Sequence, residues 1–309
     1  MKIFVCPNCL NVRTLKNCKC QMDIKNEFNI YNFIDWNIKS DFDYVTDYYL
    51  KVNKIQEELA RKIKENLDVQ IILDVGCGEG DLSLELGKLG FDVISIDIAK
   101  SGLVYLSDEA KDLDNVYVVR ADAYNIPLID NSVDLVIANN LFHLLNSPER
   151  VLEEIHRVLK KGGYFIQISE SAKSYFLENG NTYKKIKELY NKNYWLIVSE
   201  LGYKQKQYNE DFNIFLSIGN LFKYKTRLET NPVRYFGILN VERYLLRERN
   251  RTDYAKFDIP YDVHRKVHKE LVEIIEKEFG EGHKDISLNY EGETINIIDV
   301  YQKEDWDEY

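Results

Sequence analysis

The chain has 309 residues, a hydrophobic fraction of 45% and a formal net charge of -10. The apolar fraction is large enough for a folded core and excludes wholesale disorder. The acidic balance argues against a protein whose whole surface grips nucleic acid or anionic lipid, although it leaves room for a local basic patch. There is no run of about 18 apolar residues, and residues 1–5 reach Cys6 too early to form a signal peptide. We therefore expect a cytoplasmic protein that does not enter a membrane.

Four of the five cysteines lie within the first 20 residues, as Cys6 and Cys9 in one pair and Cys18 and Cys20 in a second. In a cytoplasmic chain, clustered thiols bind metal more often than they form disulfides, and four thiolates complete a tetrahedral zinc site. A segment this short would take its folding free energy from the metal. The sequence predicts a zinc knuckle over residues 1–22, and reduced thiols on a mobile arm are the alternative interpretation.

The next part of the chain changes from an aromatic-rich cap to an alternation of strands and helices. Residues 23–69 form the cap, and apolar residues at helical spacing predict a helix over 52–67. Short apolar runs then alternate with helical patterns through 70–170, which is typical of βαβ units and a parallel sheet. The runs cover residues 71–73, 93–96, 116–119, 133–137 and 164–168.

The C-terminal half of the chain has a different pattern of residues. Residues 171–285 are rich in aromatics and give few strand signals, so we predict a mostly helical substrate lid. Within it, residues 223–251 carry eight Lys or Arg against three Glu. Residues 286–309 are predicted to hold two strands that complete the sheet, with a turn at 291–293, followed by an acidic tail.

A glycine-rich turn follows the first strand of the alternating region. The sequence Leu-Asp-Val-Gly-Cys-Gly-Glu-Gly at 73–80 passes from a strand into a helix, so its backbone can approach a ligand at the carboxyl edge of the sheet. Asp97 ends the next strand 21 residues after Gly76. This is near the spacing at which an acidic side chain binds the ribose hydroxyls of an adenosine.

The turn itself disfavours a dinucleotide. Its glycine spacing is G-x-G-x-G, and Asp81 stands where the phosphate-binding fingerprint has its third glycine. Asp74, Glu79 and Asp81 crowd the turn with negative charge, which disfavours a pyrophosphate and favours a ligand that carries an amine and a sulfonium. S-adenosylmethionine is such a ligand.

Five motifs in order carry a resemblance to a known family. They are the turn at 73–80, Ser-Ile-Asp-Ile at 95–98, Ala-Asp-Ala-Tyr-Asn-Ile-Pro-Leu at 121–128, the sequence from Val133 to His143, and Val-Leu-Lys-Lys-Gly-Gly-Tyr at 158–164. Residues 70–169 resemble a class I S-adenosylmethionine-dependent methyltransferase of the small-molecule branch that includes ubiquinone and menaquinone biosynthesis methyltransferases. The resemblance implies a Rossmann-like, seven-stranded, mostly parallel sheet, with S-adenosylmethionine as cofactor and S-adenosylhomocysteine as product.

The resemblance also implies roles for individual residues. Asp97 would bind both ribose hydroxyls, Asp122 would bond the adenine amine with Ala123 beside it, and Asn139 would lie along the methionine and sulfonium. The remaining cofactor-binding candidates belong to the turn and the second strand: Asp74, Gly76, Cys77, Gly78 and Ile98. Tyr44, Tyr48 and Tyr49 lie in a segment that resembles the aromatic segment that closes over the cofactor.

Several alternatives stay open at the level of sequence. His143 follows the fourth strand and is a candidate general base, although a histidine here is also common in this branch without a catalytic role. A small-molecule acceptor is favoured, but the basic N-terminal arm and residues 223–251 leave a zinc-bearing RNA methyltransferase as the alternative. A non-catalytic binding module with the same fold is a third interpretation. The sequence does not predict the oligomeric state.

Overall fold

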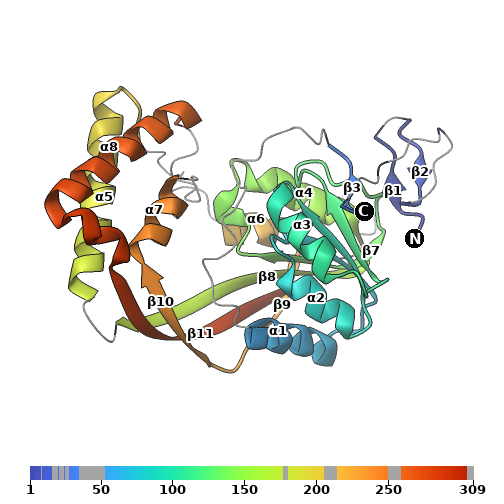
Figure 1. The fold of residues 1–309 in the computed structure, drawn as a ribbon. Helices are drawn as coiled ribbons and strands as arrows, with labels where there is room; N and C mark the ends of the chain where they lie inside the picture. The colour runs from blue at the N-terminus through green and yellow to red at the C-terminus, as the bar shows by residue number, and fades with distance from the viewer. Residues whose placement is uncertain are drawn as a thin grey trace.

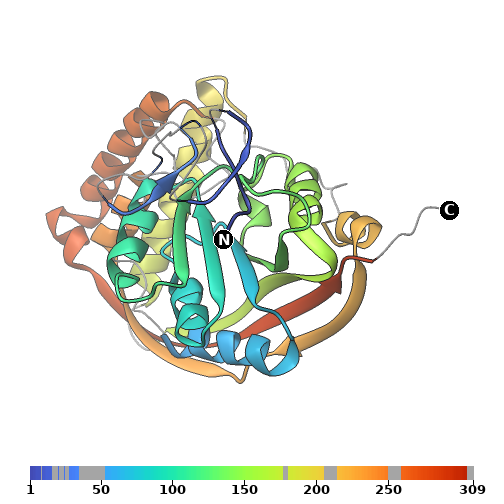
Figure 2. The ribbon, with the colours of Figure 1, turned by 90° about the vertical axis from the view of Figure 1, so that its right-hand side faces the viewer.

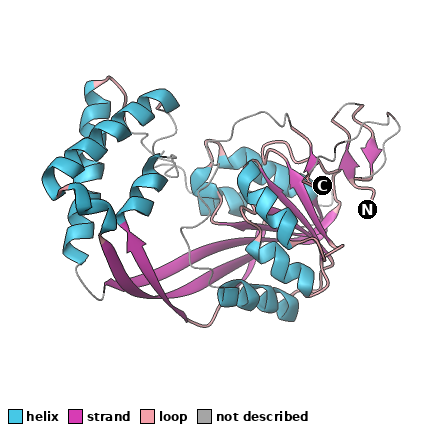
Figure 3. Ribbon diagram, in the orientation of Figure 1, coloured by secondary structure: helices cyan, strands magenta, loops and turns pink. Residues whose placement is uncertain are grey.

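The structure is a computed structural model that describes residues 1–7, 9–15, 20, 24, 28–34, 53–176, 180–204, 214–249 and 259–304. A nine-stranded sheet with helices on both faces forms the main body, and a group of helices lies at the far end of its longest strands (Figures 1 and 3). The predicted α/β class is confirmed.

Five parallel strands form the centre of the sheet in the order β6-β5-β4-β7-β8. Their bounds are β4 Ile71–Val75, β5 Asp92–Asp97, β6 Val116–Arg120, β7 Val133–Asn139 and β8 Leu159–Phe176. These strands read as nearly continuous apolar runs because both faces of a parallel sheet are buried under helices. Each run predicted from the sequence over 71–168 lies in one of these strands.

Helices on the two faces of the sheet build two separate hydrophobic clusters. On one face, the sheet packs against α1 Asn53–Asn66, α2 Asp81–Lys88 and α3 Lys100–Glu109. On the other face it packs against α4 Pro148–Val158 and α6 Ile214–Leu221. The carboxyl edge of the parallel strands therefore lies between two layers of packed helices.

Antiparallel strands complete the sheet, but residues 286–309 contribute one strand instead of the predicted two. β11 Ser287–Gln302 pairs with β8, and β9 Lys223–Glu229 pairs with β11. The order β6-β5-β4-β7-β8-β11-β9 is the predicted seven-stranded, mostly parallel sheet. Two further strands extend it, with β3 Tyr31–Asn32 beside β6 and β10 Val233–Asn240 beside β11.

The expectation that residues 171–285 are mostly helical was wrong for part of the segment. β8 continues to Phe176, and both β9 and β10 are strands. Six of the seven β9 residues are exposed, so hydrogen bonds to β11 hold this strand and no apolar pattern marks it. The helices of the segment are α5 Gly180–Glu200, α6, α7 Val241–Arg249 and α8 Tyr261–Phe279.

The predicted turn at 291–293 was also wrong, because β11 runs through it as one continuous strand. Gly292 lies opposite Tyr235 of β10 on one side and Ser174 of β8 on the other. The sequence Glu-Gly-Glu looks like a turn, but backbone pairing on both sides keeps it extended.

The helices α5, α7 and α8 form a unit with a hydrophobic cluster of its own, which joins the sheet through the long strands β8, β10 and β11 (Figure 1). Its interior includes two buried tyrosine–histidine pairs. The Tyr194 hydroxyl lies 2.9 Å from Nδ1 of His264, and the Tyr190 hydroxyl lies 2.9 Å from Nδ1 of His268. A short 3-10 helix, η3 Glu281–Asp285, follows α8. None of the helices in the described part of the chain combines the length and apolar composition that crossing a bilayer requires.

The N-terminal segment packs against the edge of the sheet near β6 and beside the loop that follows it. β1 Phe4–Val5 and β2 Val12–Arg13 form a small antiparallel pair, and β3 contributes an edge strand within the expected cap. Figure 2 views the molecule from the side on which the N-terminus lies. The cap helix is confirmed as α1, whereas Tyr44, Tyr48 and Tyr49 lie outside the described residues.

Candidate cofactor-binding site

The turn between β4 and α2 depends on three glycines with left-handed backbone angles. Gly76, Gly78 and Gly80 have φ of +71°, +58° and +75°, a region that side chains other than hydrogen rarely allow. The backbone N–H groups of Gly76 and Cys77 donate to the carbonyl of Ile96 at 2.9 and 3.1 Å. The turn is thereby fixed at the carboxyl end of β5.

Asp97 joins the glycine turn to the start of α3. Its Oδ2 accepts the backbone N–H of Gly78 at 2.8 Å, and its Oδ1 accepts that of Ala99 at 2.7 Å. A Cβ placed on Gly78 would meet no atom within 4 Å, so this side of the turn is open. Burial raises the pKa of Asp97. The neighbouring Ile98 is held through its carbonyl, which accepts Nε of the buried Arg120 at 3.0 Å.

Asp74 lies beneath the turn and is only 2% exposed. Its Oδ2 accepts the Ser83 hydroxyl at 2.6 Å, and Ser83 in turn accepts the Ser95 hydroxyl at 2.8 Å. Burial raises the pKa of Asp74 to about 6. This arrangement orders β4, α2 and β5 under the turn. Cys77 is partly buried against the cluster of the same face, as a small apolar side chain would be, and burial raises the pKa of its thiol well above the ordinary value.

Three further predicted residues lie at the carboxyl ends of β6 and β7. After β6, Asp122 accepts the backbone N–H of Tyr124 at 2.9 Å, with the half-buried Ala123 between them. At the end of β7, Oδ1 of Asn139 is buried and has no hydrogen-bond partner within the described structure. Because buried polar atoms are nearly always bonded, this oxygen is suited to a donor from a ligand.

His143 lies just after these strands, in the short helix η1 Phe142–Leu144. Its side chain is exposed, and desolvation by the surrounding chain lowers the pKa of the imidazole. Tyr124 ties this region to the Asp122 loop, because its hydroxyl accepts the backbone N–H groups of Asn146 and Ser147 at 2.9 and 3.0 Å.

Sequence reasoning missed Gly102, which lies in α3. A Cβ at this position would come within 2.5 Å of the Gly78 carbonyl oxygen, so the absence of a side chain lets α3 pack directly on the glycine turn. A lone glycine inside a helical pattern is the signal that could have marked it, since such a residue usually has a packing reason.

Comparisons with known proteins agree with this arrangement. Residues 73–167 match the family Methyltransferase domain. The demethylmenaquinone methyltransferase of Staphylococcus epidermidis is 32% identical over 180 residues, which are 54% of this chain and 71% of that protein. The chain belongs to the class I S-adenosylmethionine-dependent methyltransferases. The Staphylococcus haemolyticus protein of the same name is 29% identical to this methyltransferase over 179 residues, 54% of this chain and 72% of that protein.

A solved structure of a Methanococcus maripaludis protein, titled as an S-adenosyl-L-methionine-dependent methyltransferase, is also similar to this methyltransferase. It is 27% identical, with a TM-score of 0.36, and the match covers 37% of this chain and 55% of that one.

The site residues fit S-adenosylmethionine. The space beside Gly78 is open, the Asp97 carboxylate stands next to it, and Asn139 offers a buried acceptor without a partner. The side chains around this space are acidic and polar. Such side chains suit an adenosine and an ammonium group and disfavour a phosphate group.

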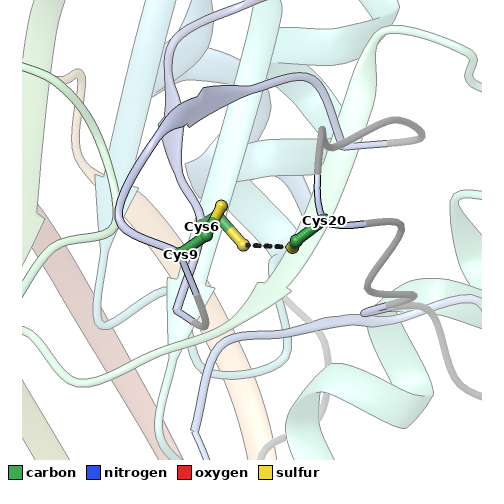
Figure 4. Close-up of side chains that lie close together, drawn as sticks. All are labelled: Cys6, Cys9 and Cys20. Atoms are coloured by element: carbon green, nitrogen blue, oxygen red, sulfur yellow. Dashed lines mark hydrogen bonds between the residues drawn. The ribbon is translucent and has the colours of Figure 1, made fainter.

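The structure also brings together three of the four predicted metal ligands. The sulfur atoms of Cys6, Cys9 and Cys20 all lie within 4.8 Å of one another, and Figure 4 shows the three side chains converging. The Cys6 and Cys20 sulfurs are 3.5 Å apart. Cys18 lies outside the described residues.

Proposed function

We propose that this methyltransferase moves the methyl group of S-adenosylmethionine to a small organic acceptor, as the relatives named for demethylmenaquinone do. The course of β8 supports the proposal. The parallel ladder ends where Asn139 pairs with Ile168, but β8 continues for eight residues to Phe176, roughly 26 Å beyond the cofactor edge. The strand leads into the α5–α7–α8 unit, which therefore stands on the side of the sheet from which an acceptor would approach.

The role of the protein in the reaction is to position the cofactor and the acceptor. S-adenosylmethionine, when bound, supplies a methyl group that its sulfonium already activates. Asp97 and Asp122 would hold the adenosine, and the glycine turn and Asn139 would orient the methionine part, so that the acceptor atom meets the methyl carbon in line. We assign His143 the role of proton acceptor for an acceptor group that must lose a proton.

The contacts of the basic stretch favour a small molecule over RNA. Nζ of Lys223 lies 2.8 Å from Glu304, and Nε of Arg227 lies 2.8 Å from Asp299. These two cations of β9 are therefore already paired within the chain, and the stretch is divided among β9, β10 and α7.

The test is a transfer assay with S-adenosylmethionine labelled in its methyl group. The protein and its Asp97→Ala variant are each incubated with a low-molecular-weight extract and with purified RNA. We expect label to appear in the low-mass fraction with the wild type alone. Label that remains with RNA and is released by ribonuclease would contradict the small-molecule proposal.

We also propose that the cysteine cluster holds a structural zinc ion. In a tetrahedral thiolate site with Zn–S bonds near 2.3 Å, neighbouring sulfurs lie about 3.8 Å apart, close to the 3.5 Å between Cys6 and Cys20. Nη1 of the buried Arg13 lies 4.0 Å from the Cys6 sulfur, which places a positive charge beside the thiolates. Cys18 would be the fourth ligand. Elemental analysis of the purified protein should find one zinc per chain, and a metal-free protein with the same thermal stability would contradict the proposal.

A further inference from the structure

The loop at 120–129 connects the cysteine cluster with the cofactor site. It begins at the end of β6, carries Asp122 and Ala123, and then passes beneath the N-terminal strand β1. Each end of this loop contacts a different part of the N-terminal segment.

The far end of the loop pairs with β1 through backbone hydrogen bonds. The Val5 N–H donates to the Pro127 carbonyl at 3.0 Å, the Ile129 N–H donates to the Ile3 carbonyl at 2.8 Å, and Phe4 forms an antiparallel bridge with Leu128. Cys6 follows Val5 directly. The position of the first thiol and the position of this end of the loop are thus set by the same short strand.

The near end of the loop is held by the segment that follows Cys20. Ile24 is buried in the main core, and its carbonyl accepts the Asn32 N–H at 2.7 Å. The Phe33 N–H then donates to the Arg120 carbonyl at 3.0 Å, two residues before Asp122. The rings of Phe4 and Phe33 stack with centroids 5.7 Å apart, which joins the two holding segments.

An independent contact holds the same loop from the side of α4. Arg157 donates to the carbonyls of Ile126 and Leu128 at 2.8 and 2.7 Å, while Pro127 faces β1. The carbonyls of Ile126 and Leu128 therefore accept hydrogen bonds from α4, and the carbonyl of Pro127 between them accepts one from the N-terminal segment. Removing the N-terminal contacts would loosen the loop without unfolding it.

We propose that metal binding at the cysteine cluster closes the N-terminal segment around the 120–129 loop and thereby strengthens cofactor binding. This inference rests on the proposed cofactor and zinc sites. The sulfurs of Cys6 and Cys20 meet at the cluster, so a thiophilic divalent cation fixes the two holding segments relative to each other. Without the metal, the two segments keep the Phe4–Phe33 stack but lose the link between Cys6 and Cys20, so the Asp122 loop samples more conformations and part of the binding free energy is spent on ordering it.

The first experiment compares S-adenosylhomocysteine affinity in zinc-loaded and chelated full-length protein under reducing conditions. Chelation should weaken binding roughly ten-fold, and one equivalent of Zn²⁺ should restore it, a size typical of coupling between two sites. By linkage, saturating S-adenosylhomocysteine should strengthen zinc binding by the same factor, which a competing chromophoric chelator measures. Circular dichroism checks that the chelated protein remains folded.

A variant in β1 tests the connection between the metal and the 120–129 loop, and it changes neither the cysteines nor the cofactor site. Val5→Pro removes the N–H that bonds Pro127 but keeps the cysteines and every proposed cofactor-binding residue. This variant should retain zinc and lose most of the dependence of S-adenosylhomocysteine affinity on the metal. Val12→Ala is the control, because Val12 lies in β2 with 42% of its surface exposed and should keep the full dependence.

The outcomes separate the inference from the functions it rests on. Equal S-adenosylhomocysteine affinity with and without bound zinc would overturn the coupling while leaving both sites in place. A Val5→Pro variant with undiminished dependence would overturn the proposed route. Failure of the zinc-loaded wild type to bind S-adenosylhomocysteine would instead overturn the cofactor assignment, and failure to bind zinc would overturn the metal site; either removes the inference as well.

Discussion

The carboxylate of Asp97 accepts the backbone N–H of Gly78 at 2.8 Å across 19 residues of sequence. This bond joins the end of β5 to the turn that follows β4, and the second carboxylate oxygen accepts the backbone N–H of Ala99, directly before α3. One acidic side chain thus sets the relative positions of the three elements that border the proposed adenosine site. This hydrogen bond forms within the chain itself and positions the turn. Substitutions that move the turn should therefore change the affinity for the cofactor.

Gly102→Ala tests the close packing of α3 on this turn. The new methyl group would lie 2.5 Å from the Gly78 carbonyl oxygen, so the turn must shift. We expect S-adenosylhomocysteine affinity to fall at least ten-fold and the free energy of unfolding to fall by about 1–3 kcal/mol. Gly219→Ala in α6 is the matched control, since its Cβ would meet nothing within 4 Å. An unchanged affinity in Gly102→Ala would contradict the role of this packing.

Asp74→Asn should make stability less dependent on pH. Burial raises the pKa of Asp74 from its ordinary 3.8 to about 6, so between these values the folded state keeps a proton that the unfolded chain has released. Stability is therefore lost as the pH rises through this window, by roughly 3 kcal/mol in total.

Asparagine keeps an acceptor for the Ser83 hydroxyl without the buried charge. We expect the variant to be more stable than the wild type at pH 7 and equally stable near pH 4, by urea unfolding without ligand. A difference in stability that does not change between these pH values would contradict the assignment.

His143→Gln tests the proposed proton acceptor once the labelling screen has provided an acceptor. The lowered pKa of the imidazole favours its neutral form, which can accept a proton. We expect kcat to fall on the order of 100-fold, with the acid limb of its pH profile lost and S-adenosylhomocysteine affinity unchanged. His156→Gln is the control, because desolvation also lowers the pKa of His156 but its ring packs against Phe222. A wild-type pH profile in His143→Gln would rule out the role.

Tyr194→Phe should destabilise the α5–α7–α8 unit. The change removes the hydroxyl that bonds Nδ1 of the buried His264 at 2.9 Å, and Nε2 of that ring already lies 2.7 Å from the Glu248 carbonyl. We expect a loss of about 1–3 kcal/mol in the free energy of unfolding. Tyr203→Phe, at a half-buried position in the same unit, should cost much less. Equal losses in the two variants would show that the hydrogen bond is not the cause.

The parallel core and the glycine turn were predictable because local chemistry determines them. A buried parallel strand must be apolar, a left-handed turn requires glycine, and Asp97 follows Gly76 at a spacing that adenosine binding repeats. Each of these signals can be recognised in the sequence without tertiary information.

Strand β9 and the unbroken course of β11 were not predictable, for the opposite reason. β9 is mostly exposed and charged, and β11 carries Glu-Gly-Glu in its middle, so both owe their extended backbone to partners far away in sequence. The docking of β1 on residues 127–129 and the packing of Gly102 on Gly78 are likewise contacts between segments that no local pattern reveals.

We propose that S-adenosylmethionine binds at the edge formed by the glycine turn and Asp97. Calorimetric titration of the purified protein with S-adenosylhomocysteine, alongside Asp97→Ala and Asp92→Ala, tests it most directly. Asp92 begins the same strand that Asp97 ends, so it controls for the loss of a carboxylate on β5. We expect micromolar binding in the wild type and in Asp92→Ala, and binding at least ten-fold weaker in Asp97→Ala. Folded wild-type protein that gives no binding heat, or an Asp97→Ala variant with wild-type affinity, would contradict it.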